Sequence, residues 1–429
     1  MDDLISAIAT AVGAGGIAVV RMSGRGALSV ARKMFSRKGE FQPNYMYAGE
    51  IDAGTFRDYG MCVYFRAPKS FTGEDVVEFH CHGGTEIARG ILKRTLELGA
   101  RLAERGEFTK RAYLNGKLSL SAAEGVGEMI AASSEAQVRA GYLLYNEKLT
   151  SLGTALQRKL THCLAEVDAD LDYPEEDLNA SSRAEIVATL REVGQELAAL
   201  LSQYAAGRKI RSGVSVALVG APNAGKSSLL NALLGYERAI VSDVAGTTRD
   251  VVEGTLEIEG VNFRITDTAG LRESADAIER EGVRRAREAM KGADVIVWLK
   301  EDGEVPEFPE GTPVITVGAK SDLARREDCD IVLSSYTGEG LDALRRLLYE
   351  RGFGRENDGA FLLSERHYRA AQAAHEAVKE ALASAEGGLP PELYAEDIRR
   401  AWETLGTLSG ETASEAIVTE IFEKFCVGK

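Results

Sequence analysis

The pattern of apolar and polar positions changes character along the 429 residues of the chain. In residues 1–118, the short stretches GGIAVVRMSG, MCVYFRAP and DVVEFHCHGG are typical of strands, and TEIARGILKRTLELGA has the spacing of a helix. This mixture of strands and helices predicts a small α+β domain at the N-terminus.

The region 119–211 is helical in pattern, and so is most of 353–429. One apolar stripe recurs at three- and four-residue steps through Leu152, Leu156, Leu160, Leu164, Val167 and Leu171. The later region contains two helical stretches, 361–386 and 392–407, separated by GGLPP. Since neither region has an apolar partner of its own, we expect the two to pack together as one helical domain. Separate domains in a row are the alternative.

Residues 212–352 lie between these helical regions and have a different pattern. The runs VSVALV, ADVIVWLK and PVITVGAKSD suit buried parallel strands, and TLEIEGVNFRITD reads as a hairpin that turns at Glu259-Gly260. This succession predicts an α/β domain. Because a domain with neighbouring ends can be inserted at little cost, we expect it to be an insertion in the helical domain.

Composition and charge narrow the classes of protein. The chain is 45% hydrophobic and 27% charged, which is ordinary for a globular protein. It has no apolar run of about 18 residues, so we expect a cytoplasmic protein without a membrane partner. Its five cysteines form no CxxC pair, which argues against a disulfide framework or a zinc site. A net charge of −15 argues against a diffuse nucleic-acid coat but leaves a local basic patch open.

The most specific motif is Gly220-x4-Gly225-Lys226-Ser227, which lies between a predicted strand and a predicted helix. This is the context of a P-loop, in which backbone N–H groups and the helix N-terminus surround phosphates. Lys226 would contact the β- and γ-phosphates, and Ser227 would hold Mg²⁺. A chance glycine turn is the alternative, and the flanking elements argue against it.

The motifs that follow resemble, in order and spacing, those of the Ras-like translation-factor GTPases. They are DVAGTTRD, with Thr248 as a second Mg²⁺ ligand, then Asp267-Thr268-Ala269-Gly270, and finally SSYTGEG. The resemblance implies a GTP site made by Asn223, Ala224, Gly225, Lys226, Ser227, Ser228, Ser242, Asp243, Val244, Ala245, Gly246, Thr247, Thr248, Asp267, Thr268, Ala269, Gly270, Ala319, Lys320, Ser321, Asp322, Ser334, Ser335 and Tyr336.

Two positions depart from that pattern. The base-reading segment Asn-Lys-x-Asp is here Ala319-Lys320-Ser321-Asp322. Asp322 can still accept from guanine N–H groups, so we expect GTP specificity with weaker affinity, because the lost amide also ties this loop to the P-loop. Leu271 stands where Ras-type enzymes place the Gln that orients water, so hydrolysis needs another group or is very slow.

Four separated stretches together resemble the tRNA-modification GTPase family MnmE, also called TrmE. They are GAGGIAVVRMSG, FTGEDVVEFHCHGG with RGEFTKRAYLNGKLSLSAAEG, the GTPase motifs, and the terminal FCVGK. The resemblance implies a homodimer that forms a heterotetramer with the flavoprotein MnmG (GidA). Together they would add an aminomethyl-type group to C5 of the wobble uridine of certain tRNAs. A tetrahydrofolate derivative, 5-formyl- or methylene-tetrahydrofolate, would supply the carbon, and FAD would enter only through the partner.

The same resemblance implies a folate site in the N-terminal domain. Its contacts would be Arg21, Glu78, Lys117 and Lys429, with Cys426 beside the chemistry. A carboxylate suits the amide donors of a pterin, and cations suit the glutamate tail. The alternative is that Arg21 and Glu78 form an ordinary ion pair. Arg105 stands where the family usually has proline, so this loop is expected to differ slightly.

For GTP hydrolysis the family uses potassium. The resemblance implies K⁺ ligands at Asn223, Ser242, Val244 and Thr247, and Glu279 as the acid that positions water in place of a Gln. Cation charge there would offset charge that develops in the transition state. GTPase domains would pair across the dimer. The alternative for Glu279 is a plain charged helix face.

Three interpretations stay open. His80 and His82, on one face of a strand, are either a metal pair or polar residues that line a pocket. FCVGK fails as a prenylation box, which leaves a structural stub or a part of the site.

The alternative function is a GTP-switched RNA-binding or ribosome-assembly factor without modification chemistry. The sequence contains no evident basic RNA-binding module of the kind such factors carry, since we interpret Arg208-Lys209-Arg211 as a solvated linker.

Overall fold

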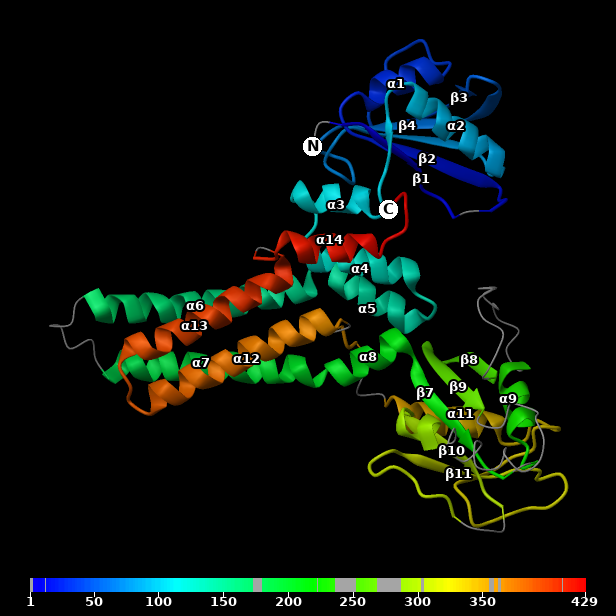
Figure 1. Ribbon diagram of the computed structural model, residues 1–429, viewed down its shortest axis with the longest axis vertical. Coiled ribbons are helices and arrows are strands. Elements are labelled where there is room, and N and C mark those ends of the chain that lie inside the picture. Colours follow the sequence, from blue (N-terminus) through cyan, green and yellow to red (C-terminus); the bar gives the residue numbers. More distant parts are fainter. Residues whose placement is uncertain are drawn as a thin grey trace. The chain divides into compact units, whose positions relative to one another are not determined.

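The computed structural model describes residues 3–429 except 12, 173–179, 222, 236–251, 268–286, 302–304, 355–358, 362–363 and 411. These residues form two compact units (Figure 1). The first comprises Met1–Gly127, Leu144–Thr189 and Glu380–Lys429, and the second comprises Glu128–Leu143 and Leu190–Lys379. Among the described helices, none combines the length and apolar character that a bilayer crossing requires.

The N-terminal part of the first unit is a six-stranded sheet with the order β3-β4-β5-β2-β1-β6. Its strands are β1 Ile5–Ile8, β2 Ile17–Ser23, β3 Met46–Asp52, β4 Arg57–Phe65, β5 Val76–His82 and β6 Arg101–Leu102. Helices α1 (Ala27–Met34) and α2 (Thr85–Glu97) cover one face, because alternate strand residues such as Val20, Phe79 and Cys62 point into a common core with them. The predicted α+β fold is confirmed.

The helices that precede and follow the second sheet in the sequence are α3 Glu107–Leu114, α4 Leu120–Ala131, α5 Glu135–Tyr145, α6 Lys148–Asp172, α7 Ala180–Ser202, α8 Tyr204–Ser212, α12 Glu365–Glu386, α13 Pro391–Ser409 and α14 Glu415–Glu423. In the first unit α6 packs along α13, which confirms that the two helical regions share a core (Figure 1). The predicted stripe is buried at Leu156, Leu160 and Val167. The buried line also includes Cys163, which the apolar spacing did not predict.

The second unit contains a sheet with the order β12-β11-β10-β7-β9-β8. Its strands are β7 Val214–Val219, β8 Val252–Ile258, β9 Val261–Asp267, β10 Val295–Leu299, β11 Val314–Gly318 and β12 Ile331–Val332, and its helices include α9 Lys226–Gly235 and α11 Leu341–Gly352. β8 and β9 are antiparallel and the remaining pairs are parallel. The predicted hairpin turn is confirmed, since Glu259 and Gly260 have φ angles of 47° and 79°.

The tip of the β8–β9 hairpin is bonded to the start of α5 within the second unit. The Ala136 amide donates to the carbonyl of Gly260 at 2.8 Å, and Asn262 Nδ2 donates to Ser133 Oγ at 2.8 Å. Gln137 extends this contact, because its Oε1 accepts from the Ser133 amide at 2.6 Å and its Nε2 donates to the Arg211 carbonyl at 2.9 Å. The hairpin is therefore fixed at both ends, in the sheet and on α5.

The interpretation of Arg208-Lys209-Arg211 as a solvated linker was wrong. These residues lie in α8, where Arg208 pairs with Asp294 at 3.3 Å and Lys209 Nζ donates to the Gly352 carbonyl at 2.7 Å. Arg211 pairs with Glu128 at 3.0 Å. The cluster therefore anchors α8, and its charges are used within the second unit.

Candidate functional site

The P-loop of the second unit connects β7 to α9. Asn223 and Gly225 adopt φ angles of 64° and 102°, which turn the chain tightly before the first helical residue. Lys226 is buried, and its Nζ donates to the carbonyls of Gly220 at 2.7 Å and Ala221 at 2.8 Å. Ser227 and Ser228 are exposed in the first turn of α9, and Ala224 is buried. The loop thus places a cation and a helix N-terminus at one point, which suits phosphate.

The segment after β11 approaches the P-loop. Lys320, with a φ angle of 60°, donates from Nζ to the Asn223 carbonyl at 2.7 Å. The neighbouring Ala319 is half-buried and offers no side-chain donor. Lys320 therefore ties the base-reading segment to the P-loop, whereas Ala319 contributes no side-chain hydrogen bond to it.

The last predicted loop packs beside this segment. Ser334 is fully buried, and its hydroxyl donates to Asp322 Oδ1 at 2.6 Å, which orients the carboxylate. The Ser321 amide donates to the Leu333 carbonyl at 3.1 Å. Ser335 is half-buried, whereas Tyr336 is 91% exposed. The P-loop, the base-reading segment and the last loop are thus brought together as the sequence predicted.

Several predicted nucleotide and potassium residues lie outside the described residues. They are Ser242, Asp243, Val244, Ala245, Gly246, Thr247, Thr248, Thr268, Ala269, Gly270 and Glu279. Asp267 ends β9, which places its backbone beside β7, next to the P-loop strand.

In the N-terminal domain, Arg21 and Glu78 face each other on the sheet side that α1 and α2 leave uncovered. They are register partners on β2 and β5, and Arg21 Nε donates to Glu78 Oε1 at 2.7 Å. His80 Nε2 lies 3.2 Å from Glu78 Oε2. Burial alone would raise the pKa of Glu78, but the hydrogen bond from His80 and the charge of Arg21 outweigh it, and the pKa lies below its ordinary value. Glu78 is therefore a carboxylate at neutral pH.

Aromatic and basic groups surround this pair. The Arg21 guanidinium lies 6.0 Å from the ring centre of Phe71 and 5.7 Å from that of Phe108. Lys117 is exposed and donates from Nζ to the Pro68 carbonyl at 3.1 Å, on the loop that carries Phe71. Arg21 and Lys117 therefore both approach the loop that carries Pro68 and Phe71, and folate binding by Arg21, Glu78 and Lys117 stays a prediction. The ion pair of the alternative interpretation is also present.

The two histidines have different partners. His80 contacts Glu78, whereas His82 Nδ1 lies 2.6 Å from Asp58 Oδ1. Within the described ranges, no group of three or more His, Cys, Asp or Glu side chains is arranged to hold a metal ion. Each histidine is thus paired with a different carboxylate.

The C-terminal tail docks on the N-terminal domain at the start of α3. The Gly106 amide donates to the Cys426 carbonyl at 3.3 Å, and the Phe108 amide donates to the Lys429 carbonyl at 3.1 Å. Val427 forms a bridge with the backbone of Arg105. Gly428 has a φ angle of 94°, and a Cβ there would lie 2.3 Å from the Ile8 carbonyl oxygen. The chain therefore bends at this glycine in close contact with Ile8.

The tail and the Arg21–Glu78 pair meet at α3. Phe108 receives the end of the tail through its backbone and faces Arg21 through its ring. Upstream, Phe425 is buried against α4, with ring atoms 2.9 Å from where a Cβ of Gly127 would lie. The thiol of Cys426 is exposed. The tail is thus packed against α4 and bonded to the start of α3, and its part in a site stays a prediction.

Sequence reasoning missed the residues that hold α3 in place. Arg111 is 1% exposed and pairs with Asp3 at 2.8 Å, with Glu74 at 3.1 Å and with Glu107 at 2.9 Å. A buried arginine needs several acceptors, and here they come from three different segments. The four-residue spacing of Glu107 and Arg111 was the available signal, but their burial was not visible in it.

The fold and the nucleotide site define the class: a P-loop GTPase joined to an α+β domain and a helical domain. Models of known families match nearly all of the chain. The MnmE helical domain matches residues 120–426, and the N-terminus of the GTP-binding protein TrmE matches residues 4–117. The chain belongs to the MnmE (TrmE) family of tRNA modification GTPases.

Curated relatives agree with this assignment. The tRNA modification GTPase MnmE of one Thermus thermophilus strain is 43% identical over 100% of this chain and 99% of its own length. The protein of the same name from Aquifex aeolicus is 38% identical over 100% of both chains. The predicted family is therefore confirmed, and the protein is a GTPase.

Solved structures match parts of the chain. The G domain of the T. maritima FeoB iron transporter is 28% identical over 32% of this chain and 98% of its own, with a TM-score of 0.23. A variant of Aquifex aeolicus Era bound to GDP and AlF4⁻ is 27% identical over 38% of this chain and 65% of its own, with a TM-score of 0.26.

Proposed function

We propose that the protein uses GTP hydrolysis to support addition of an aminomethyl-type group to C5 of the wobble uridine of certain tRNAs. It acts with a flavoprotein of the MnmG (GidA) type, which brings FAD, and a tetrahydrofolate derivative supplies the one-carbon unit. One observation carries this proposal over a GTP-switched assembly factor: the tail with Cys426 docks on α3, beside the Arg21–Glu78 pair. A factor without modification chemistry has no use for a thiol held there.

The chemistry of the N-terminal site fits a reduced folate. Each oxygen of Glu78 has one partner within the protein, and a carboxylate has about four lone-pair sites, so acceptors remain for the amide donors of a pterin. Phe71 and Phe108 offer ring surfaces. Lys117 places a cation at the Pro68 carbonyl, and the backbone of Lys429 lies at the start of α3, so both residues could attract the glutamate tail. Cys426 contributes a thiol at the edge of this site.

The nucleotide site fits GTP with Mg²⁺. Lys226 would exchange its two loop carbonyls for phosphate oxygens, and Ser227 with Thr248 would hold Mg²⁺, which offsets phosphate charge. Asp322, oriented by Ser334, accepts from the guanine N–H donors. Lys320 holds the base-reading segment against the P-loop.

We also propose that hydrolysis depends on potassium. Asn223 lies exposed on the P-loop with a positive φ angle, which makes its side chain available as a ligand. Ser242, Val244 and Thr247 would complete the set, and Glu279 would position the attacking water, since Leu271 has no polar group. The charge of the potassium ion beside the phosphates would then stabilise the transition state, as an arginine does in other GTPases. The GTPase domains pair across the homodimer.

The uncovered sheet face supports the proposed dimer. Ile17, Met46 and Tyr59 are 61%, 44% and 65% exposed, and they lie on strands of the same face as Arg21 and Glu78. Exposed apolar area of this kind is typical of a protein interface. A second copy would also enclose the folate, and the dimer then binds the flavoprotein as a heterotetramer.

The hairpin contact offers a route from the GTPase domain to the helical domain. β9 pairs with β7, which ends at the P-loop, and the hairpin tip is bonded to α5 through Gly260 and Asn262. Both segments that surround the nucleotide in the family, 236–251 and 268–286, join the ends of this hairpin. A shift of β9 would therefore move α5.

The test is binding of 5-formyl-tetrahydrofolate to the full chain, measured by titration calorimetry. We expect saturable binding that is reduced at least tenfold in Glu78→Gln, with unchanged GTP turnover. Glu97→Gln on α2 is the control, since it removes an exposed carboxylate of the same domain. Absence of binding by the unaltered protein would favour the assembly-factor alternative.

A further inference from the structure

The strongest feature outside the two sites is a run of unneutralised positive charge on α1. Between Asp3 and Glu40 the sequence contains no Asp or Glu but six cations, in a protein of net charge −15. These cations are Arg21, Arg25, Arg32, Lys33, Arg37 and Lys38. Only Arg21 among them belongs to the folate site.

The other five cluster around α1. Arg25 precedes the helix, Arg32 and Lys33 lie in its last turn on the exposed side, and Arg37 and Lys38 follow it. Of these, Arg25, Arg32, Lys33 and Lys38 are exposed and form no ion pair with any residue that the structure describes. We call these five residues the α1 basic surface.

The neighbouring helix on the same sheet face shows that this is unusual in the molecule. On α2, Arg89 pairs with Glu86 at 3.0 Å, and Arg94 and Lys93 lie 3.0 and 3.9 Å from Glu97. These pairs follow the i,i+3 and i,i+4 spacing of a self-neutralised helix surface. The α1 basic surface has no such partners, so its charge is available to an external anion.

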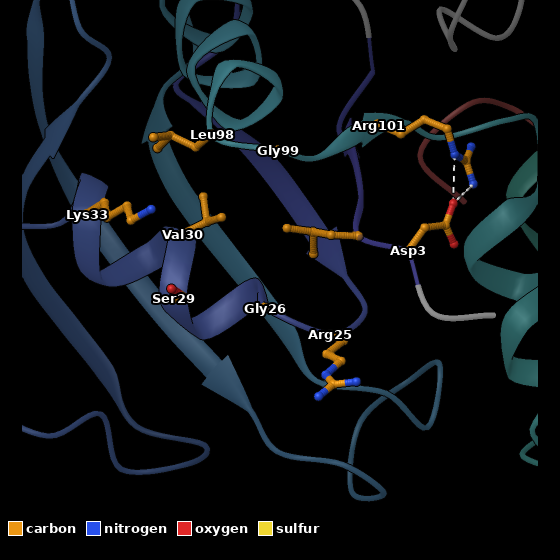
Figure 2. A pocket seen from close by; sticks show the side chains of 10 residues that line it. Asp3, Arg25, Gly26, Ser29, Val30, Lys33, Leu98, Gly99 and Arg101 are labelled. Atoms are coloured by element: carbon orange, nitrogen blue, oxygen red, sulfur yellow. Dashed lines mark hydrogen bonds and ion pairs between the residues drawn. The ribbon is translucent and has the colours of Figure 1, made fainter.

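The surface is hollowed in two places, one along α1 and one after its last turn. One hollow, of about 420 Å³, is lined by Arg25, Ser29 and Lys33 on one side and by Leu98, Gly99 and Arg101 on the other (Figure 2). Asp3 also lines it, but this carboxylate is paired with Arg101 at 2.7 Å and with Arg111 at 2.8 Å. The hollow therefore has a net positive lining.

The second hollow, of about 390 Å³, is lined by Arg32, Arg37, Lys38, Gly39 and Glu40. Arg37 is held in place, since its guanidinium lies 3.7 Å from the ring centre of Tyr47 and its Nε donates to the Glu40 carbonyl at 3.0 Å. Glu40 is the one carboxylate in this lining. The cations at this end still outnumber it by three to one.

We propose that the α1 basic surface binds the phosphate backbone of the tRNA substrate. The proposal rests on the tRNA-modifying function proposed above. An eight-residue helix is about 12 Å long, so the two hollows suit successive phosphates of a polyanion better than one small anion. A membrane surface fits less well, because the exposed positions between the cations, Ser29 and Ser36, are polar and provide no apolar group to insert.

Contacts of this kind set position and not sequence preference. The α1 basic surface therefore holds the body of the tRNA and does not select the wobble base. Its loss should weaken binding of all tRNAs alike and lower the salt dependence of binding.

The test compares two matched pairs of substitutions in the full chain. Arg25→Gln with Lys33→Gln removes two cations of the α1 basic surface, and Arg89→Gln with Lys93→Gln removes two paired cations of α2. Binding of an unmodified tRNA transcript is measured by fluorescence anisotropy at several potassium chloride concentrations. Thermal unfolding followed by circular dichroism reports that each variant is folded, and GTP turnover reports that its nucleotide site is intact, since none of these residues belongs to that site.

We expect the α1 pair to weaken tRNA binding on the order of tenfold and to reduce the slope of log K against log salt by about 1.4 to 1.8. The α2 pair should change affinity less than twofold. Equal affinity and slope for the α1 pair and the unaltered protein would overturn the proposal and leave the tRNA-modifying function intact. Failure of the unaltered protein to bind any tRNA would overturn both.

A parallel measurement uses vesicles that contain phosphatidylglycerol. We expect no vesicle binding that depends on Arg25 and Lys33. Vesicle binding that is lost in the α1 pair, with tRNA binding unchanged, would assign the surface to a membrane and overturn the proposal.

Discussion

At the scale of single residues, the base-reading segment of the nucleotide site combines one missing group with one contact that is present. Ala319 lacks the amide that would contact the base and support the P-loop. Lys320 does support the P-loop, because its ammonium donates to the Asn223 carbonyl at 2.7 Å. The contact with the base itself has no replacement among the described side chains. The remaining cost should therefore fall on nucleotide affinity and not on the position of the loop.

Ala319→Asn should strengthen binding of GDP. One additional hydrogen bond contributes about 0.5–1.5 kcal/mol, which corresponds to an increase of roughly two- to tenfold in affinity. Titration with a fluorescent GDP analogue measures this. Unchanged or weaker affinity in Ala319→Asn would show that the base site is already complete.

The proposed role of Asn223 as a potassium ligand leads to a second prediction for a single residue. With Leu271 unable to orient water, hydrolysis should need potassium, and replacement of K⁺ by Na⁺ should reduce GTP turnover at least tenfold. Asn223→Ala should be slow in both salts. Equal rates in the two salts for the unaltered protein would contradict the assignment of Asn223 as a ligand.

At the scale of elements, α3 organises the N-terminal site. Arg111 holds α3 in place through its buried ion pairs, and the Phe108 ring faces Arg21. The amides of Gly106 and Phe108 donate to the carbonyls of the C-terminal tail. The tail follows from α14, whose apolar face packs with Phe425 against α4. A single helix therefore positions both the ion pair and the thiol-bearing tail.

Gly428→Ala should release the tail from α3. Its φ angle of 94° is strained for alanine, and the new Cβ would lie 2.3 Å from the Ile8 carbonyl oxygen. We expect faster removal of Lys429 by a carboxypeptidase and weaker binding of 5-formyl-tetrahydrofolate. Gly99→Ala is the matched control, since Gly99 has a φ angle of 107° but no atom close to the added Cβ. Equal digestion of both variants would show that the close approach to Ile8 is unimportant.

At the scale of the whole molecule, the nucleotide site and the proposed folate site lie in different units. The P-loop and the base-reading segment belong to the second unit, and the Arg21–Glu78 pair and Cys426 belong to the first. The hairpin tip bonded to α5 connects the GTPase domain to the helical domain. Changes at one site should therefore leave the basal chemistry of the other intact.

Cys426→Ser should separate the two activities. We expect tRNA modification, assayed with the flavoprotein partner, to fall at least a hundredfold, while GTP turnover stays within twofold. Cys426 is exposed, so the exchange of sulfur for oxygen should disturb packing little. Modification at the normal rate in Cys426→Ser would reduce the tail to a structural element.

The sequence by itself determined the fold class, the family and the nucleotide motif. These properties depend on local patterns, namely strand and helix periodicity and the glycine spacing of the P-loop, which hold wherever the segments lie. It also indicated the packing of the two helical regions, because each apolar stripe needs a partner. It could not show that Cys163 lies in the buried line of α6, since a cysteine is not distinctive in a periodic pattern.

Only the tertiary structure decided which distant charges meet. It brought Arg111 to Asp3 and Glu74, and it showed that Arg208-Lys209-Arg211 anchor α8. It also showed that Arg32 and Lys33 of α1 form no ion pair with a described residue, whereas Arg89, Lys93 and Arg94 of α2 do. It also showed that FCVGK ends against α3. The physical reason is that an ion pair or a docked terminus depends on the separation of atoms in space, and residues such as Arg111 and Glu74 are far apart along the chain.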